Sequence, residues 1–444
     1  MKKSEYIETV QLAIPVVIGQ LSSMLMNVTD NVMVGHINPE SLSAATLATS
    51  VFILIAIIAL GAMNAVPSLV SEARGAENEV ELSNLLQATK WSGVIWGIGS
   101  GILVYLSSFF IGSLGQPAQD VALAAPFIRI FAYATPFMII FLAIKGFFDG
   151  MEKTRIGMIV SILGLILNLF LNQILIFGCF GYTGMGFIGS AWATFTSRFL
   201  MMVAMIVILY KHEFSRLYGN AKEIWTPALR KLFSLGFPMG LQIFFEIAAF
   251  SGAAIMIGWF EGRSATVGRS AHQIVLNMCS ITYMVAMGIS VAGSVRVGEA
   301  YGRKDAEGIR NAGKAALRIG IGAMGVFSLI LLLTSTFFTS IYGIYDKEVQ
   351  DVTLRLSIIA AVFQLFDGAQ CVSAGLLRGL QDVVFPTFVT FATYWVMWIP
   401  LAYYLAFKCK MGVDGIWWGD VIALGVAAVA LYARYIYLLK KGVI

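Results

Sequence analysis

The chain has 444 residues, of which 58% are hydrophobic and only 12% are charged. A soluble protein of this length has about a quarter of its residues charged, so most of this protein's surface is not expected to face water. The net charge is modest, +5, and the basic residues lie mainly between the apolar runs, so nothing indicates a nucleic-acid-binding face. The four cysteines are scattered without a CxxC pair, which predicts neither a disulfide framework nor a zinc site.

Apolar runs of about 20 residues, long enough to cross a bilayer, occur about twelve times along the chain. The first continues through a whole span, so we expect a membrane helix there and no cleavable signal. The runs are continuous and lack the strict alternation of barrel strands, which leaves a helix bundle. We place the spans near 11–35, 44–71, 90–112, 122–148, 156–177, 186–210, 233–259, 270–295, 313–338, 352–378, 384–407 and 414–439.

The loops between these runs differ in their content of Lys and Arg. If the N-terminus is cytoplasmic, the inner loops carry most of these residues, including the groups within 211–231 and 303–314. The first three outer loops carry none. Because basic residues concentrate on the cytoplasmic side of membrane proteins, the pattern predicts a multi-pass protein of the cell (inner) membrane with both termini in the cytoplasm.

Four short segments of the first half recur, in the same order, in the second half. Their offsets are 223, 227, 229 and 226 residues, so two copies of a six-span unit are expected. The matched positions are Pro15 with Pro238, Gly75 with Gly302, Gly150 with Gly379, and Gly189 with Gly415.

An even number of spans returns the chain to its starting side, so the two copies are expected to be parallel repeats. The predicted fold is an all-α membrane protein with twelve transmembrane helices in two six-helix lobes around a central cavity. We expect an N-lobe over 1–212, a cytoplasmic interlobe linker over 213–232 and a C-lobe over 233–444.

Three acids lie isolated in apolar spans: Asp30, Glu246 and Asp367. A carboxylate at the bilayer centre costs roughly 2.5–3.5 kcal/mol on insertion scales, and such residues usually mark ion or substrate pathways. We therefore expect them to face a wet cavity and to hold protons or cations in transit. The alternative is a permanent ion pair with a basic residue inside another span, namely Arg129, Lys145 or Arg198.

Amide side chains accompany these acids at helical spacing. In the first span Gln20, Ser23, Asn27 and Asp30 share one face at spacings of 3, 4 and 3. Polar residues of this kind line cavities, although they also serve simply to bond neighbouring helices. The other candidates are Asn168 and Asn172 in the fifth span, Gln242 one turn before Glu246, and Gln364 three residues before Asp367.

Some other polar residues are expected to have no part in a site. Asp149, Glu152, Asp382 and Asp414 lie at predicted loop edges and are expected to be solvated, and His272 is expected to pack inside the protein.

The sequence contains no P-loop, no HExxH motif and no Ser/His/Asp constellation, so neither ATP-driven work nor catalysis is expected. Two carboxylates with amide oxygens suit a small hard cation or a shared proton. We therefore expect no enzyme activity and no cofactor, with Na⁺ or H⁺ as the coupling ion.

The stretches VTDNVMVG, LNLFLNQILIFG with GMGFIGSAWAT, SAHQI and FDGAQCVSAGLLRG together resemble the multidrug and toxic compound extrusion (MATE) family, in its NorM-like branch. The resemblance covers essentially the whole chain. It implies a secondary active antiporter that exports organic, often cationic, drugs in exchange for inward Na⁺ or H⁺.

By position, the resemblance assigns a monovalent-cation site in the C-lobe to Glu246 and Asp367. It assigns a proton or substrate site in the N-lobe to Asp30 with Asn168 and Asn172. Phe363 stands where that branch often has a Tyr four residues before the acid, which removes one possible ligand. The presence of both C-lobe acids favours Na⁺, with H⁺ as the alternative.

Two other function classes fit the sequence less well than an antiporter. A flippase for lipid-linked precursors would need a strongly basic cavity, whereas the cavity expected here has isolated acids and few bases. A channel or membrane-embedded enzyme would not require a two-lobe duplication. The expected partners are small-molecule drugs and membrane lipid, without nucleic acid, and we expect a monomer.

Overall fold

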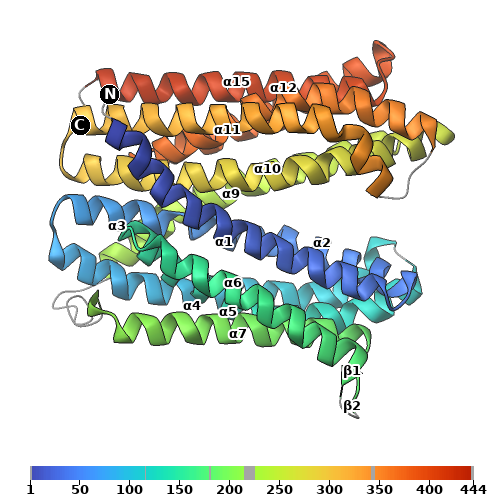
Figure 1. Cartoon of the computed structure of the whole chain (residues 1–444), viewed down its shortest axis with the longest axis horizontal. Helices are drawn as coiled ribbons and strands as arrows, with labels where there is room; N and C mark the ends of the chain where they lie inside the picture. The colour runs from blue at the N-terminus through green and yellow to red at the C-terminus, as the bar shows by residue number, and fades with distance from the viewer. Residues whose placement is uncertain (1–2, 116, 180–181, 215–225, 342–345, 442–444) are drawn as a thin grey trace. The chain divides into compact units, whose positions relative to one another are not determined.

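The computed structural model describes residues 3–115, 117–179, 182–214, 226–341 and 346–441, and nearly all of them are helical (Figure 1). Within these ranges, twelve helical segments are long and apolar enough to cross a membrane, which confirms the all-helical fold and the number of spans. The α-helices are α1 (Lys3–Gly35), α2 (Pro39–Ala62), α3 (Ala65–Gly75), α4 (Glu79–Phe110), α5 (Ala118–Gly150), α6 (Thr154–Asn172), α7 (Phe187–Lys211), α9 (Thr226–Ile257), α10 (Arg263–Gly302), α11 (Ala306–Ile341), α12 (Lys347–Gly379), α13 (Val384–Phe391), α14 (Ile399–Tyr403) and α15 (Val413–Lys440).

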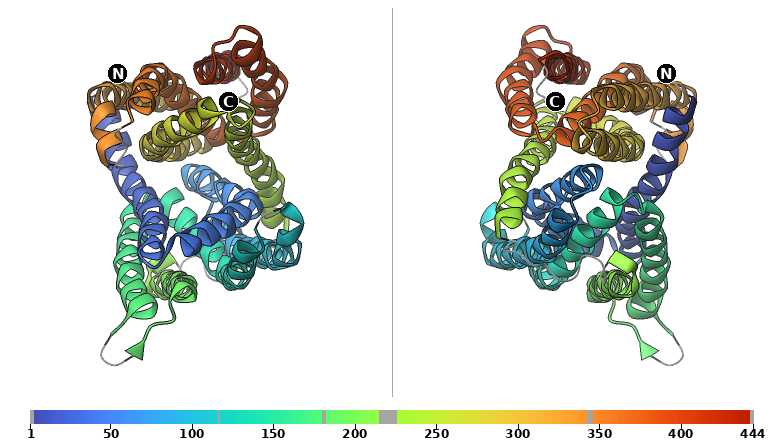
Figure 2. Two further views of the ribbon diagram at one scale, coloured as in Figure 1. Left: turned by 90° about the vertical axis from the view of Figure 1, so that its right-hand side faces the viewer. Right: turned by 90° about the vertical axis from the view of Figure 1, so that its left-hand side faces the viewer.

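Shorter elements complete or connect these helices. They are the 3₁₀ turn η1 (Ile111–Leu114), the π-helical turns η2 (Gln173–Phe177), η3 (Ala392–Trp398) and η4 (Tyr404–Lys408), and the strands β1 (Gly178–Cys179) and β2 (Tyr182–Thr183). The two strands pair antiparallel. Figure 2 shows this hairpin extending away from the helices that flank it.

Most helices are longer than the apolar runs that predicted them. The eighth span, expected over 270–295, is the 40-residue helix α10. Hydropathy marks only the apolar middle of a helix, whereas the backbone hydrogen bonds continue into its polar ends. The second span is two helices, α2 and α3, which are separated at Met63 and Asn64.

Large apolar side chains cover much of the helix surfaces. Leu333 is 83% exposed, and Phe110 and Val384 are each 68% exposed. Isolated exposed apolar residues are common in soluble proteins, but such residues here occur on nearly every helix. Together with the lengths of the spans, they indicate surfaces that face lipid.

The chain divides into two compact units. Unit 1 comprises Met1–Val17 and Leu241–Ile444, and unit 2 comprises Ile18–Gly240. Each boundary falls inside a helix, α1 or α9, so each of these helices contributes to both units. Most of the predicted linker, residues 215–225, lies outside the described residues, and 226–232 already belong to α9. The predicted lobe limits stay a prediction.

The same packing pattern occurs within each unit. In unit 2, α5 is the central helix and packs against α2, α4 and α7. In unit 1, α12 is the central helix and packs against α10, α11 and α15, which run alongside it (Figure 1). These are the fourth span of each predicted repeat surrounded by its second, third and sixth spans. The packing therefore agrees with the duplication seen in the sequence.

The backbone repeats the duplication in greater detail. Residues with positive φ recur at the offsets of the sequence repeat. The matched pairs are Glu77 (52°) with Lys304 (56°), Glu152 (60°) with Gln381 (61°), and Gly186 (60°) with Gly412 (62°). Residues other than glycine rarely adopt this conformation. Its recurrence at three matched turns shows that both copies kept the same loop geometry.

An aromatic and aliphatic cluster of unit 1 fixes α12, α15 and η3 relative to one another. Its buried members include Phe363 of α12, Trp417 of α15, and Tyr394 and Trp398 of η3. The Trp398 indole donates to the Ile416 carbonyl oxygen at 3.3 Å. This cluster positions the polar groups of the candidate site that lie next to it along the same helices.

One residue that was predicted to be solvated, Asp149, is buried. Asp149 is only 3% exposed and accepts a hydrogen bond at 2.7 Å from Nζ of Lys145, which is buried with it on α5. The expectation that Asp149 is solvated was wrong because α5 continues to Gly150 inside the packed unit. The pair also shows that Lys145 compensates its own neighbour and none of the three isolated acids.

Replacing Lys145 with Met should lower the free energy of unfolding by roughly 3–5 kcal/mol, because it leaves the Asp149 carboxylate buried without its partner. The exposed pair of Arg263 and Asp346 serves as the control. Arg263→Gln should cost roughly 0–1 kcal/mol, since exposed pairs contribute little. Thermal unfolding in detergent micelles measures both, and an equal effect of the two changes would contradict the expectation.

Candidate functional site

Asp30 of α1 is bound in a closed polar network in unit 2. The Asn172 amide donates to Asp30 Oδ1 at 2.6 Å, and the Thr194 hydroxyl donates to Oδ2 at 2.6 Å. The Asn172 amide also donates to Asn168 Oδ1 at 3.2 Å, and the Asn168 amide contacts Thr194 Oγ1 at 3.4 Å. All four side chains are buried. The structure thus brings together the three N-lobe residues named from the sequence.

Thr194 completes this network and was not among the residues expected from the sequence. Thr194 lies on α7 within the stretch SAWATFTS, and a threonine in an apolar span carries no distinctive signal. Only the tertiary structure, which brings Thr194 of α7 against α1, shows that it meets Asp30. Each oxygen of the Asp30 carboxylate therefore accepts a hydrogen bond from a neutral donor. Such charge-assisted hydrogen bonds are stronger than those between neutral groups.

The alternative of a permanent ion pair is not what the described residues of unit 2 show. Arg198 acts electrostatically on Asp30, but no direct salt bridge joins the two. Its guanidinium lies over the rings of Phe52 and Phe131, at 5.2 Å from each centroid. Arg129 instead donates to the hydroxyl of Ser108 at 3.2 Å.

The remaining polar residues of the first span lie outside this network. Ser23 donates to the carbonyl oxygen of Gly19 on its own helix at 3.1 Å. Gln20 and Asn27 are half-buried, and neither makes a side-chain hydrogen bond within the described ranges. Their predicted role in a cavity stays a prediction.

Among its described residues, unit 1 has three buried carboxylates rather than the two expected. Glu246 of α9 is 8% exposed, Asp367 of α12 is 3% exposed and Asp420 of α15 is 6% exposed. Asp367 interacts electrostatically with both of the other acids, and Asp420 interacts with Glu246. The two acids named from the sequence therefore lie in one electrostatic group, together with a third.

Asp420 was not among the acids expected from the sequence, although its sequence context marks it. It stands alone in the apolar run GIWWGDVIALG of the twelfth span, by the same criterion that marked the other acids. One of its oxygen atoms, Oδ1, is buried and has no hydrogen-bond partner. Buried polar atoms without a partner are uncommon and call for a physical explanation.

Hydroxyl groups near these acids come from residues that the sequence analysis did not name. Tyr283 of α10 lines a pocket together with Glu246 and acts on its carboxylate, and the Tyr394 phenol of η3 interacts electrostatically with all three carboxylates. The Tyr394 hydroxyl is buried without a hydrogen-bond partner. Phe363 itself packs against Phe250 and Trp417.

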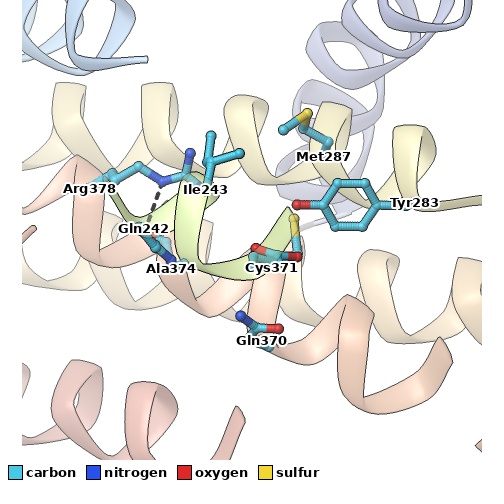
Figure 3. Close-up of a pocket in the computed structure, with 9 residues that line it drawn as sticks. Gln242, Ile243, Tyr283, Met287, Gln370, Cys371, Ala374 and Arg378 are labelled. Atoms are coloured by element: carbon cyan, nitrogen blue, oxygen red, sulfur yellow. Dashed lines mark hydrogen bonds between the residues drawn. The ribbon is translucent and has the colours of Figure 1, made fainter. Parts of the chain in front are cut away.

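A small pocket opens beside Glu246 (Figure 3). Its volume is about 10 Å³, which is on the order of the space that one water molecule needs. It is lined by residues from α9, α10 and α12: Gln242, Ile243, Glu246, Tyr283, Met287, Gln370, Cys371, Ala374 and Arg378. Gln242 therefore lines the same pocket as Glu246.

Asp367 and Gln364 are not among the residues that line this pocket. Gln364 is fully buried, and its amide contacts the Cys279 sulfur at 3.9 Å, while its Oε1 has no partner. Across the described ranges, no three acidic, His or Cys side chains are grouped closely enough to hold a metal ion. Joint binding of a cation by Glu246 and Asp367 stays a prediction.

His272 packs as expected. It is buried on α10, its ring lies 5.6 Å from that of Trp417, and neither ring nitrogen has a hydrogen-bond partner. Of the other acids expected to be solvated, Glu152 is exposed and pairs with Arg74 at 2.9 Å. Asp382 and Asp414 are half-buried and pair with Arg434 at 2.7 Å and with Arg355 at 2.9 Å. None of these groups lines the pocket described above.

Solved structures with the same fold cover nearly the whole chain. The eukaryotic MATE transporter AtDTX14 gives a TM-score of 0.88 at 21% identity, covering 99% of this chain and 98% of the other. A MOP superfamily transporter from Pyrococcus furiosus gives 0.86 at 21% identity, covering 99% and 96%. At this level of identity the likeness establishes the fold.

Sequence comparisons extend from the fold to the family. The probable multidrug resistance protein NorM of Rhizobium meliloti (strain 1021) is 31% identical over 441 residues, covering 97% of this chain and 93% of the relative. The multidrug resistance protein NorM of Burkholderia vietnamiensis is 32% identical over 445 residues, covering 98% and 94%. The family model MatE matches twice, over residues 15–174 and 238–404, and these two matches begin at Pro15 and Pro238 of the duplication. The resemblance seen in the sequence is confirmed, and the chain belongs to the MatE family.

Proposed function

We propose that the chain is a multidrug efflux antiporter, which exports organic, often cationic, compounds in exchange for inward Na⁺ or H⁺. Its relatives named as NorM are multidrug resistance proteins. The chain's own residues support the ion-coupled part of the function, because acids inside membrane spans usually mark ion pathways.

The observation that carries this proposal is the group of three buried carboxylates in unit 1. Asp367 and Asp420 have no salt bridge to Lys or Arg within the described part of the chain. An uncompensated carboxylate in apolar surroundings is costly, and a bound cation or proton removes that cost. Glu246, Asp367 and Asp420 therefore suit reversible neutralisation by an entering ion.

Exchange follows if the ion and the drug favour opposite states of the transporter. If the ion binds more tightly to the state that has low drug affinity, the bound ion lowers drug affinity. The bound drug then lowers ion affinity by the same factor, because coupling between sites is reciprocal. We assign the ion to the unit 1 carboxylates and the Asp30 network to proton or substrate binding. The drug is then released on the outer side as the ion enters.

The membrane placement forms part of this proposal. The distribution of Lys and Arg supports cytoplasmic N- and C-termini and insertion into the cell inner membrane. Membrane lipid and small-molecule drugs are the proposed partners, the protein acts as a monomer, and no cofactor other than the coupling ion takes part.

The test is transport of a fluorescent cationic dye in vesicles that contain the purified protein. A sodium gradient and a pH gradient are imposed separately, with protein-free vesicles and ionophore-treated vesicles as controls. We expect one of the two gradients to drive dye against its own gradient, and a dye gradient to move that ion in return. Dye movement that is independent of both gradients would contradict the proposal.

A further inference from the structure

Arg378 is a buried cation at the C-terminal end of α12, one residue before the helix ends at Gly379. It is 8% exposed, and two of its groups contact neutral oxygens: Nε donates to the Ala374 carbonyl at 3.2 Å and Nη2 donates to the Ser290 hydroxyl at 3.2 Å. A buried guanidinium requires negative charge nearby, because neutral acceptors do not balance its charge.

Ser290 holds the guanidinium in place. Its hydroxyl donates to the Cys371 carbonyl at 2.6 Å, which ties α10 to α12. The two helices approach each other closely at Gly375, where an added Cβ would collide with the Ser290 side chain. The position of Arg378 is therefore set by packing between α10 and α12.

Arg378 lies in the same pocket as Glu246. Figure 3 shows Arg378 and Tyr283 at opposite ends of the labelled lining residues. Tyr283 and Arg378 both line the pocket with Glu246, and Arg378 acts electrostatically on its carboxylate. The pocket thus contains an acid and a base with room for about one water-sized particle.

One face of α12 carries an acid in the interior of the helix, Asp367, and a base at its C-terminal end, Arg378. Asp367, Cys371, Ala374 and Arg378 are spaced by 4, 3 and 4 residues, which places them along one helical face. Asp367 and Arg378 are separated by about 16 Å along the helix at 1.5 Å per residue. Glu246 interacts with both, so it is repelled by Asp367 and attracted by Arg378.

We propose that Arg378 is the resident counter-charge of Glu246, and that Na⁺ competes with its guanidinium for this carboxylate. This inference rests on the proposed ion-coupled transport. A cation that enters beside Glu246 is repelled by the guanidinium, so Arg378 weakens Na⁺ binding. A transported ion must bind strongly enough to enter yet weakly enough to leave. Repulsion by Arg378 weakens Na⁺ binding and so allows the ion to leave.

The competition can be measured on the full-length protein in detergent micelles. The thermal unfolding midpoint is recorded against NaCl concentration, with choline chloride keeping ionic strength constant, because a ligand that binds the folded state stabilises it by mass action. We expect Arg378→Gln to lower the half-saturating Na⁺ concentration roughly tenfold or more, the effect of removing a nearby charge. Arg378→Lys, which retains the charge, should stay within about threefold of the original protein.

Two further variants separate competition from a structural role. Arg434→Gln removes another arginine of unit 1, paired with Asp382 away from the pocket, and should leave the half-saturating concentration unchanged. Ser290→Ala removes a neutral acceptor of the Arg378 guanidinium, which should then interact more strongly with the Glu246 carboxylate. The half-saturating Na⁺ concentration should therefore rise. This variant keeps the test possible if Arg378→Gln does not fold.

A double-mutant cycle decides whether the effect acts through Glu246. In the Glu246→Gln background, Arg378→Gln should no longer change the Na⁺ response. An unchanged response in Arg378→Gln alone, the same shift with and without Glu246, or no Na⁺ response in the unaltered protein would each overturn the inference. Dye transport that no ion gradient drives would instead overturn the proposed function, so the two failures can be told apart.

Discussion

Replacing Glu246 with Gln and Asp367 with Asn together should reduce ion-driven dye efflux to the leak of protein-free vesicles. Both changes keep the shape of the side chain and remove its negative charge, so the entering cation loses the two groups that would compensate it. Coupling between transport sites is typically worth roughly 1–3 kcal/mol, or about 5- to 150-fold. The measurement is the initial rate of dye movement under the gradient that drives the unaltered protein.

The matched control is Asp346→Asn, which removes an exposed acid of the same unit that pairs with Arg263. It should leave gradient-driven efflux unchanged. Thermal unfolding of each purified variant distinguishes lost coupling from lost folding. If the double variant still exports dye under an ion gradient at the original rate, the carboxylates of unit 1 do not couple transport.

Replacing Asp30 with Asn should lower efflux at least about tenfold while the protein stays folded. An amide at residue 30 can still accept from Asn172 and donate to Thr194, so the hydrogen-bonded geometry of the network is retained. What is lost is the charge that α1 places between α6 and α7. The readouts are the efflux rate and the thermal midpoint, measured in the same preparation.

The control for this change is Thr194→Val, which keeps the Asp30 charge and removes one of its two donors. Loss of a hydrogen bond to a charged group should cost roughly 1.5–3 kcal/mol of stability. We expect Thr194→Val to be less stable yet more active than Asp30→Asn. The opposite order would mean that the network serves structure and that its charge has no part in transport.

The conserved geometry of the two repeats could be anticipated because it depends on local sequence. The turn at Glu77 and the turn at Lys304 each follow a helix that ends with similar residues, and both adopt positive φ. The matching offsets between the two halves were visible in the amino-acid sequence alone. Helix ends and turns are short-range features, so a repeat in sequence predicts a repeat in backbone.

Other parts of the site could not be inferred in this way. Thr194 has no sequence feature that marks it as a partner of Asp30, since 164 residues separate them. Tyr283 and Arg378 belong to different helices from Glu246 and meet it only through packing. Asp420 is a different case, because its isolation in an apolar run was available to inspection and was overlooked.

The sequence by itself determined the membrane class, the number of spans, the duplication and the isolated acids, because apolar length and charge placement are properties of the chain read in order. Only the tertiary structure decided which donors hold Asp30, that Asp149 is buried against Lys145, and that an arginine shares the pocket of Glu246. The physical reason is that burial and partner choice arise from contacts between distant helices. Hydropathy and spacing describe one helix at a time and contain no record of those contacts.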